Sequence, residues 1–140
     1  MAITYTLVSS PDKPSRRWRA LFRQLNRRHF HFYGHPIHHH WWWVAQEKGG
    51  LLGFAGAKPY DAHSLWMGPS GVLPAARGQG IQLRLLEIRE AWARDQGWQR
   101  CVSVVDADNW YSTNNFIRAG YLLGENTTPI DGLYLTKELT

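Results

Sequence analysis

The sequence predicts an α/β fold in one domain, residues 1–140. Segments in which apolar and polar residues alternate are interspersed with segments of helical apolar spacing, in the order β-α-β-β-β-α-β-α-β-β. Aromatic residues make up 14% of the chain and eight of them are tryptophan, so the chain has enough apolar side chains to form one hydrophobic core. Short clusters of Gly and Pro separate the segments, as expected of turns.

The N-terminal third predicts a strand followed by a basic amphipathic helix. Residues 2–9 alternate as a strand, and residues 10–15 carry the breakers that start a helix. From 16 to about 32 an apolar stripe follows helical spacing, opposite a stripe of arginines. The apolar stripe comprises Trp18, Leu21, Phe22, Leu25 and His29, and the basic stripe comprises Arg16, Arg19, Arg23 and Arg27.

The middle of the chain predicts a meander of three strands, after the break at residues 33–36. These strands cover 41–47, 51–59 and 63–73, with turns at 48–50 and 59–61. Residues 69–71 read Pro-Ser-Gly, so a bulge is expected in the third strand. Alternation along the first strand would bury Trp41 and Trp43 on one face, while Trp42 would face the other side, toward the helix predicted next. We interpret these tryptophans as core residues, with an aromatic substrate platform as the alternative.

The C-terminal half predicts two helices alternating with strands. A helix over 79–96 places Ile81, Leu85, Ile88 and Trp92 on one face, and Gly97 ends it. A strand follows over 99–105, then a helix over 109–119. Two final strands are expected at 121–124 and 132–138.

The turn before the helix 79–96 is the most informative segment of the chain. Residues 71–83 read as the end of a strand, a basic glycine turn and the start of a helix. The first N–H groups of a helix are unpaired, and together with the helix dipole they bind anions. Arg77 adds a full charge, and Gly78 and Gly80 let a phosphate approach the backbone closely. The sequence therefore predicts a phosphate-bearing cofactor held by main-chain groups.

This turn resembles the acetyl-CoA signature of the GCN5-related N-acetyltransferase (GNAT) family. The family pattern is Arg or Gln, two residues, Gly, one residue, then Gly or Ala, and the chain reads Arg77-Gly78-Gln79-Gly80-Ile81-Gln82. Gln82 departs from the small residue expected last, which would crowd the pyrophosphate or add a hydrogen bond to it. A second resemblance lies at Asn109, Phe116, Gly120 and Tyr121, which match an Asn, an aromatic and a Gly-aromatic pair at family offsets.

The resemblance covers roughly residues 41–138, and residues 1–40 fit only loosely. It implies a GNAT-like mixed, mostly antiparallel central sheet with splayed strands, flanked by helices on both faces. It also implies that acetyl-CoA is the acetyl donor and that a bulge at 69–71 admits the pantetheine arm between two strands. The implied cofactor-binding residues are Val72, Leu73, Arg77, Gly78, Gln79, Gly80, Ile81, Gln82, Asn109 and Phe116.

Within this site the resemblance implies separate tasks. Val72 and Leu73 would offer main-chain hydrogen bonds to pantetheine and polarise the thioester carbonyl. Asn109 would bind the pantetheine arm, and it is equally well interpreted as the N-cap of the following helix. Many members carry a tyrosine at the position of Phe116 to protonate the leaving thiolate. Phenylalanine has no proton to give, so Tyr111, Ser112 or water would replace it, the thiolate would leave unaided, or catalysis would be impaired.

The predicted function is direct transfer of acetyl from acetyl-CoA to a primary amine of a small molecule or protein. The attacking ammonium must lose a proton, and we take His63 and Asp61 as the first candidate bases, before Asp106 and Glu47. The predicted catalytic residues are thus His63, Asp61 and Tyr111. Cys101, the single cysteine, lies in an apolar stretch and is expected to be an inert core residue, so no covalent enzyme intermediate is expected.

The uneven distribution of charge along the chain supports an alternative function of a different class. Residues 1–46 hold seven Lys and Arg against one acid, whereas residues 47–140 hold nine against ten. The alternative is a non-catalytic GNAT-fold module that binds nucleic acid or another polyanion through the helix 16–28. A solvated basic face is the simpler interpretation, and an amine on a nucleic acid or ribosomal protein would combine both functions.

Six histidines lie between residues 29 and 40, namely His29, His31, His35, His38, His39 and His40. No cysteine or carboxylate completes a ligand set before Glu47, so we predict no metal site and interpret the cluster as a channel wall or solvated loop. The lone cysteine and the absence of a recognisable secretion signal or apolar run of 18 residues favour a cytoplasmic protein without a membrane span. A monomer or homodimer is expected.

Overall fold

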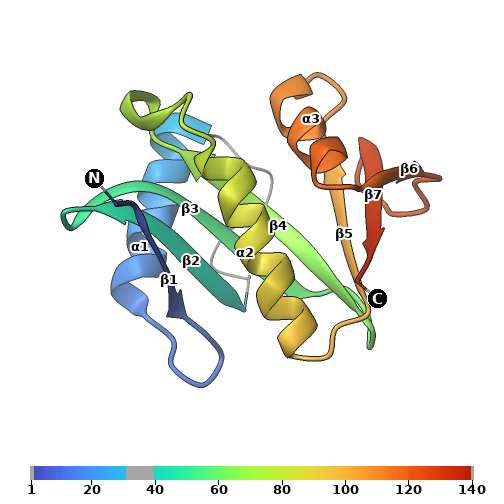
Figure 1. Ribbon diagram of the computed structural model, residues 1–140, viewed down its shortest axis with the longest axis horizontal. Helices are drawn as coiled ribbons and strands as arrows, with labels where there is room; N and C mark the ends of the chain where they lie inside the picture. The colour runs from blue at the N-terminus through green and yellow to red at the C-terminus, as the bar shows by residue number, and fades with distance from the viewer. Residues whose placement is uncertain (1, 31–39, 140) are drawn as a thin grey trace.

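The computed structural model describes residues 2–30 and 40–139, which form a seven-stranded sheet with the order β1-β2-β3-β4-β5-β7-β6 (Figure 1). Every neighbouring pair is antiparallel except β4 and β5, which are parallel. This confirms the predicted mixed, mostly antiparallel sheet. The strands are β1 (Thr4–Ser9), β2 (Trp41–Glu47), β3 (Gly50–Pro59), β4 (Ser64–Val72), β5 (Arg100–Val105), β6 (Leu122–Gly124) and β7 (Leu133–Glu138).

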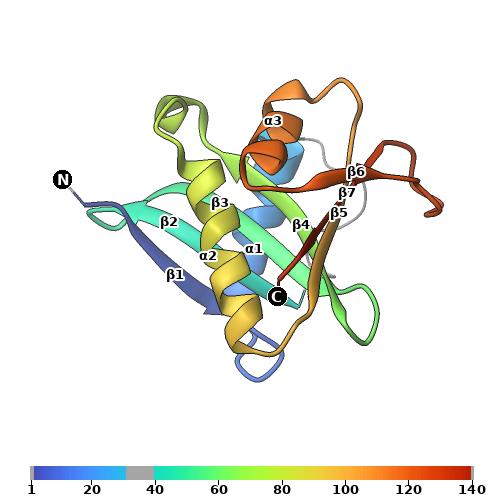
Figure 2. The same ribbon diagram turned by 45° about the vertical axis from the view of Figure 1, so that its right-hand side comes forward.

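Helices cover both faces of this sheet, as predicted. Figures 1 and 2 show α1 (Arg16–Leu25) on one face and α2 (Ile81–Asp95) on the other, with α3 (Trp110–Arg118) beside the N-terminal half of α2. The first helix is shorter than predicted, because α-helical geometry ends at Leu25 and continues as a π-helical turn, η1 (Asn26–Phe30). Asn26, a weak helix former, is buried at this junction.

The aromatic residues of β2 divide between two cores. Trp42 packs against Phe22 of α1, with ring centroids 4.8 Å apart, whereas Trp41 and Trp43 contact Trp92 of α2 at 4.9 and 5.2 Å. The predicted alternation is confirmed, but the predicted direction is wrong, since Trp42 faces α1 rather than α2. The connection from β4 through α2 to the parallel strand β5 places that helix on the opposite face from α1 (Figures 1 and 2).

The predicted bulge interrupts the pairing of β3 with β4. Ala55 pairs with Ser70 and Ala57 pairs with Met67, so β4 has one more residue than β3 in this interval. The buried guanidinium of Arg89 in α2 lies against the irregularity, and its Nη1 donates to the carbonyls of Gly56 (3.0 Å) and Gly68 (3.5 Å). Arg89 therefore satisfies carbonyl groups on both strands of the bulged pair.

Beyond the bulge β4 separates from β5. The two strands pair only at Ser64–Arg100, Leu65–Cys101 and Trp66–Val102, although β4 continues to Val72. Figure 1 shows the two strands diverging toward the end that carries α3 and the loop before α2. The sheet is therefore splayed at the carboxyl ends of its two parallel strands.

Two further predictions concern the N-terminal region and membranes. Of the clustered histidines, His31, His35, His38 and His39 lie outside the described residues. His40 is exposed, and its backbone N–H donates to the carbonyl of Ala57 at 2.9 Å. Among the helices of the described residues, none is both long and apolar enough to cross a membrane.

Candidate functional site

The glycine turn predicted from the sequence lies at the carboxyl end of β4, beside the splayed region. After β4 the chain forms a short 3-10 helix, η3 (Pro74–Ala76), and then passes Gly78 and Gly80, both with positive φ (85° and 73°). Gly80 is the N-cap residue of α2 and offers no side chain to its first turn. A Cβ at either glycine would meet nothing within 4 Å, so the turn is open on its outer side.

This turn presents a run of unpaired backbone donors. Within the part of the chain that the structure describes, no hydrogen bond is donated by the N–H groups from Gly78 to Leu83, and the first helical bond joins Arg84 N to Gly80 O at 3.0 Å. Consecutive free N–H groups at the positive end of a helix dipole form a site for an anion such as a pyrophosphate.

Three other groups of the turn are used internally. The Arg77 Nε donates to the Val72 carbonyl (3.1 Å), and the Gln79 Nε2 donates to the Ala76 carbonyl (3.2 Å). The Leu73 N–H, which the family resemblance would offer to pantetheine, donates to the Leu52 carbonyl of β3 (2.8 Å). The remaining N–H groups of the Arg77 guanidinium are on an exposed residue and can still face an anion.

Gln82, the residue that departs from the family pattern, joins three elements through its side-chain amide. Its Nε2 donates to Ser70 Oγ of β4 (3.0 Å) and to Ser112 Oγ of α3 (3.4 Å), and its Oε1 accepts from Asn115 Nδ2 of α3 (3.0 Å). Ser112 and Asn115 are both buried. The amide therefore has all its donors and acceptor engaged, and it ties α3 to the end of β4 that diverges from β5.

The other α3 residues occupy distinct positions. Asn109 caps the helix, and its Oδ1 accepts from the Ser112 N–H at 3.1 Å, which confirms the capping role. Phe116 is buried and packs edge-on against Tyr121, with centroids 4.8 Å apart. Tyr111 is 57% exposed and points away from this core. Of the predicted hydroxyl donors, Ser112 therefore faces the interior and Tyr111 faces solvent.

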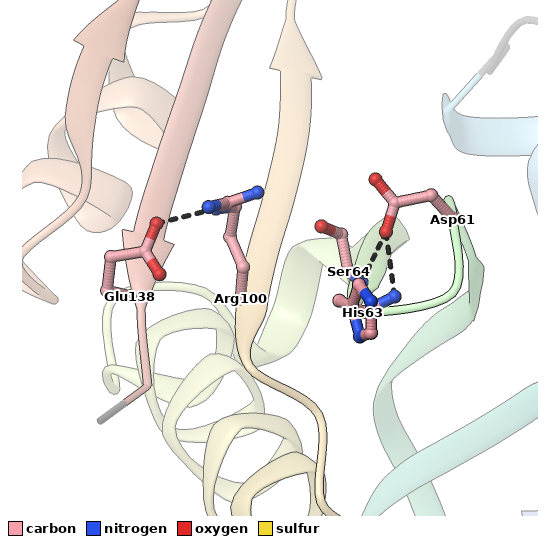
Figure 3. A network of polar contacts seen from close by, with 5 residues as sticks. All are labelled: Asp61, His63, Ser64, Arg100 and Glu138. Atoms are coloured by element: carbon pink, nitrogen blue, oxygen red, sulfur yellow. Dashed lines mark hydrogen bonds and ion pairs between the residues drawn. The ribbon is translucent and has the colours of Figure 1, made fainter.

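The predicted bases Asp61 and His63 lie elsewhere. They precede β4, whereas the glycine turn follows it, and a nine-residue strand spans about 25–30 Å. Asp61 Oδ1 accepts from the N–H groups of His63 (2.8 Å) and Ser64 (2.7 Å), close to the Arg100–Glu138 ion pair (Figure 3). The His63 N–H has the largest effect and lowers the pKa of the Asp61 carboxyl, burial acts in the opposite direction, and the Ser64 N–H lowers the pKa further. A carboxylate held in this way stabilises the β3–β4 turn and is a weak base.

The two remaining base candidates lie at the other edge of the sheet. Asp106 directly follows β5, and Glu47 ends β2, which runs in the same direction as β4. Because β4 and β5 are parallel, Asp106 follows the strand that borders the divergence on one side while the glycine turn follows the strand on the other. The structure thus brings Asp106, the glycine turn and the start of α3 to one edge.

Ser70 and Asn115 are not among the residues predicted for the site, and Gln82 is predicted to bind the cofactor, not to join β4 to α3. A usable indication was present in α3, because Ser112 and Asn115 share the face of Phe116 at i, i+3 and i+4 spacing. Polar residues on a buried helical face need partners. As for metals, residues 2–30 and 40–139 contain no group of three or more His, Cys, Asp or Glu arranged to bind one.

Comparison with known proteins agrees with this geometry. The model of the family described as Acetyltransferase (GNAT) family matches residues 6–121. A search of the curated proteins finds no match. A GNAT-family acetyltransferase from Staphylococcus aureus Mu50 is similar with a TM-score of 0.81 and 12% identity, over 99% of this chain and 100% of that one.

Two further solved structures are similar over nearly the whole chain. One is the ribosomal-protein-S18-alanine N-acetyltransferase from Escherichia coli (TM-score 0.79, 14% identity, 99% of this chain and 95% of that one). The other is a GNAT-family acetyltransferase from Elizabethkingia anophelis with acetyl-CoA bound (TM-score 0.71, 15% identity, 97% of each chain). At these identities the likeness to the solved structures concerns the fold.

Proposed function

Because the chain belongs to the acetyltransferase (GNAT) family, we propose that it transfers an acetyl group from acetyl-CoA to a primary amine. The observation that carries this proposal is the run of free N–H groups from Gly78 to Leu83 beside the divergence of β4 and β5. The donors suit a pyrophosphate, and the divergence suits an extended arm between two strands. The open space at Gly78 and Gly80 lets phosphate oxygens approach the backbone.

The residues at this edge have different proposed roles. The N–H groups from Gly78 to Leu83 and the Arg77 guanidinium would hold the phosphates of acetyl-CoA, which supplies an activated thioester. Of the four candidate bases we assign proton removal from the amine to Asp106, since it directly follows a strand that borders the divergence. Direct transfer is supported by Cys101, because burial raises the pKa of its thiol to about 11 and leaves it a poor nucleophile.

Binding and turnover can be measured separately. Calorimetric titration with acetyl-CoA is expected to show saturable binding, and absence of binding at millimolar acetyl-CoA would overturn the proposal. Release of free thiol from acetyl-CoA, followed across polyamines, amino acids, aminoglycosides, peptides and modified nucleobases, would then identify the acceptor class. Dethio-coenzyme A is a suitable competitor, because it carries the phosphates but no thioester.

Restoring the family hydroxyl tests how the thiolate leaves. For Phe116→Tyr we expect less than about a tenfold gain in turnover with the acceptor found above, against 10²–10⁴-fold when a general acid is newly supplied. A free thiol has a pKa near 8.5, so a thiolate is a tolerable leaving group, and amine attack is the more plausible slow step. Because Phe116 is buried, an unsatisfied hydroxyl would cost about 1–3 kcal/mol of stability. A gain above a hundredfold would mean that the natural chain is a weakened catalyst.

A second candidate function is polyanion binding by α1. Three arginines of this helix, Arg16, Arg19 and Arg23, line one surface hollow opposite the buried Phe22. We expect a DNA or RNA gel shift whose affinity falls steeply with salt if this face binds phosphates, and no shift at physiological salt if it is only solvated. Charge reversal at Arg16 and Arg23 should remove the shift while acetyl-CoA binding stays unchanged, which separates the two functions.

A further inference from the structure

We propose that Ser112 donates a hydrogen bond to the sulfur of coenzyme A as the thiolate forms, and that Gln82 positions it for this task. The proposal rests on the proposed function, and it names the group that replaces the hydroxyl absent from Phe116. It follows from the direction of the hydrogen bonds around Gln82 and from the place of Ser112 on α3.

The amide of Gln82 is oriented within a hydrogen-bond network. Asn115 Nδ2 donates to Gln82 Oε1 at 3.0 Å. The amide nitrogen then faces Ser112, whose Oγ accepts from it at 3.4 Å. Among the described residues, this is the only hydrogen bond that the Ser112 hydroxyl forms, and the hydroxyl oxygen is its acceptor. The hydroxyl hydrogen of Ser112 is therefore left to donate to another group.

The place of Ser112 matches the missing family hydroxyl. Ser112 lies four residues before Phe116, so both side chains project from the same face of α3, and both are buried, at 7% and 6% exposure. Tyr111, the other tyrosyl or seryl donor on this helix, is 57% exposed. Through Gln82, Ser112 is also joined to Ser70, which lies on the part of β4 that no longer pairs with β5. The Ser112 hydroxyl is thus linked to the part of β4 that diverges from β5.

The proposed contact acts on the leaving group. When the amine nitrogen bonds to the acetyl carbon, the carbon–sulfur bond breaks and its electron pair passes to sulfur. The nitrogen loses its proton to a base or to water, so the products are the acetylated amine and the thiolate, and the Ser112 O–H bond stays intact. A hydrogen bond to an ionised acceptor is stronger than one to a neutral acceptor, so Ser112 stabilises the thiolate more than the thioester.

The test measures the thiol of bound coenzyme A and needs no acceptor. Affinities for coenzyme A and for acetyl-CoA are measured by calorimetry from pH 6.5 to 9.5, and their ratio cancels titrations of the protein. If Ser112 stabilises the thiolate, the thiol pKa falls on binding. The ratio of coenzyme A to acetyl-CoA affinity then rises with pH by roughly ten- to a hundredfold.

Four variants test whether Ser112 causes this rise of the affinity ratio with pH. For Ser112→Ala we expect the rise to fall below about threefold with unchanged acetyl-CoA affinity, and for Ser112→Thr we expect the rise to persist because the hydroxyl is kept. Gln82→Ala should reduce the rise partly, since the hydroxyl remains but is no longer oriented. Tyr111→Phe should leave it as in the natural chain. In turnover measurements, adding Phe116→Tyr to Ser112→Ala should restore the rate that Ser112→Ala loses.

The outcomes separate this inference from the proposed function. A rise that survives in Ser112→Ala, or that is lost in Tyr111→Phe instead, overturns the role of Ser112. A natural chain that binds both ligands with no pH-dependent rise also overturns it, while acetyl-CoA binding still supports the proposed function. A natural chain that binds neither ligand overturns the proposed function and this inference together.

Discussion

Replacing Gly80 by glutamate is expected to abolish acetyl-CoA binding, with an affinity loss of at least about a hundredfold, or ~2.7 kcal/mol. The new carboxylate would project from the centre of the run of free N–H groups that the pyrophosphate would occupy, and two negative groups cannot share these donors. Isothermal titration with acetyl-CoA measures the loss directly. An affinity within threefold of the natural chain, in a folded variant, would refute this location for the phosphates.

The chain offers a matched control at the other end of the same helix. Gly97 also has a positive φ (88°) and open space at its Cβ, so Gly97→Glu adds the same side chain in a similar backbone conformation. Both variants should lose about 1–2 kcal/mol of stability, because a side chain in the left-handed region is strained. Only Gly80→Glu should lose acetyl-CoA binding. Circular dichroism on both variants confirms that they are folded.

Replacing Arg89 by methionine is expected to lower the free energy of unfolding by about 2–4 kcal/mol. Arg89 is 1% exposed, and burial lowers the pKa of its guanidinium to about 10, which leaves it charged at neutral pH. Methionine would fill much of the volume but would leave the carbonyls of Gly56 and Gly68 without their donor at the bulge. Removing the desolvated charge offsets part of this cost, so the expected loss is smaller than for a pair of fully orphaned carbonyls.

Denaturant unfolding distinguishes this effect from the loss of an ordinary positive charge. Arg118→Met removes an exposed arginine from α3 and should change the unfolding free energy by less than about 0.5 kcal/mol. Arg89→Lys should lie between the natural chain and Arg89→Met, because it keeps the charge and a donor but not the geometry of the guanidinium. If Arg89→Met is as stable as the natural chain, the bulge does not depend on this donor.

Most of the architecture could be predicted because it is recorded in local patterns. Alternation, helical spacing and glycine turns located, in their order, the seven strands and three α-helices of residues 2–30 and 40–139, and Pro69 marked the bulge. The glycine turn at 77–80 could be predicted to present unpaired N–H groups, because those groups are free at a helix start whatever the rest of the fold does. The family resemblance then supplied the sheet type, which the structure confirms.

The candidate bases show where local reasoning was insufficient. His63 and Asp61 are the first bases that the sequence suggests, yet the strand predicted over 63–73 already separates them from the glycine turn by its own length. Sequence distance within one strand is distance in space, whereas two strands that run in parallel bring their ends together. That is why Asp106, 29 positions after Arg77, lies at the edge that His63 does not reach.

What the sequence by itself determined is therefore the set of elements, their order and the glycine turn with its unpaired N–H groups, since each depends on residues a few positions apart. Only the tertiary structure decided that Trp42 faces α1, that the Leu73 N–H is used by β3, and that Gln82 joins Ser70 to Ser112. These contacts depend on strand register and on the face of the sheet that each helix covers. Such choices are made by packing between distant segments, which no local pattern of residues records.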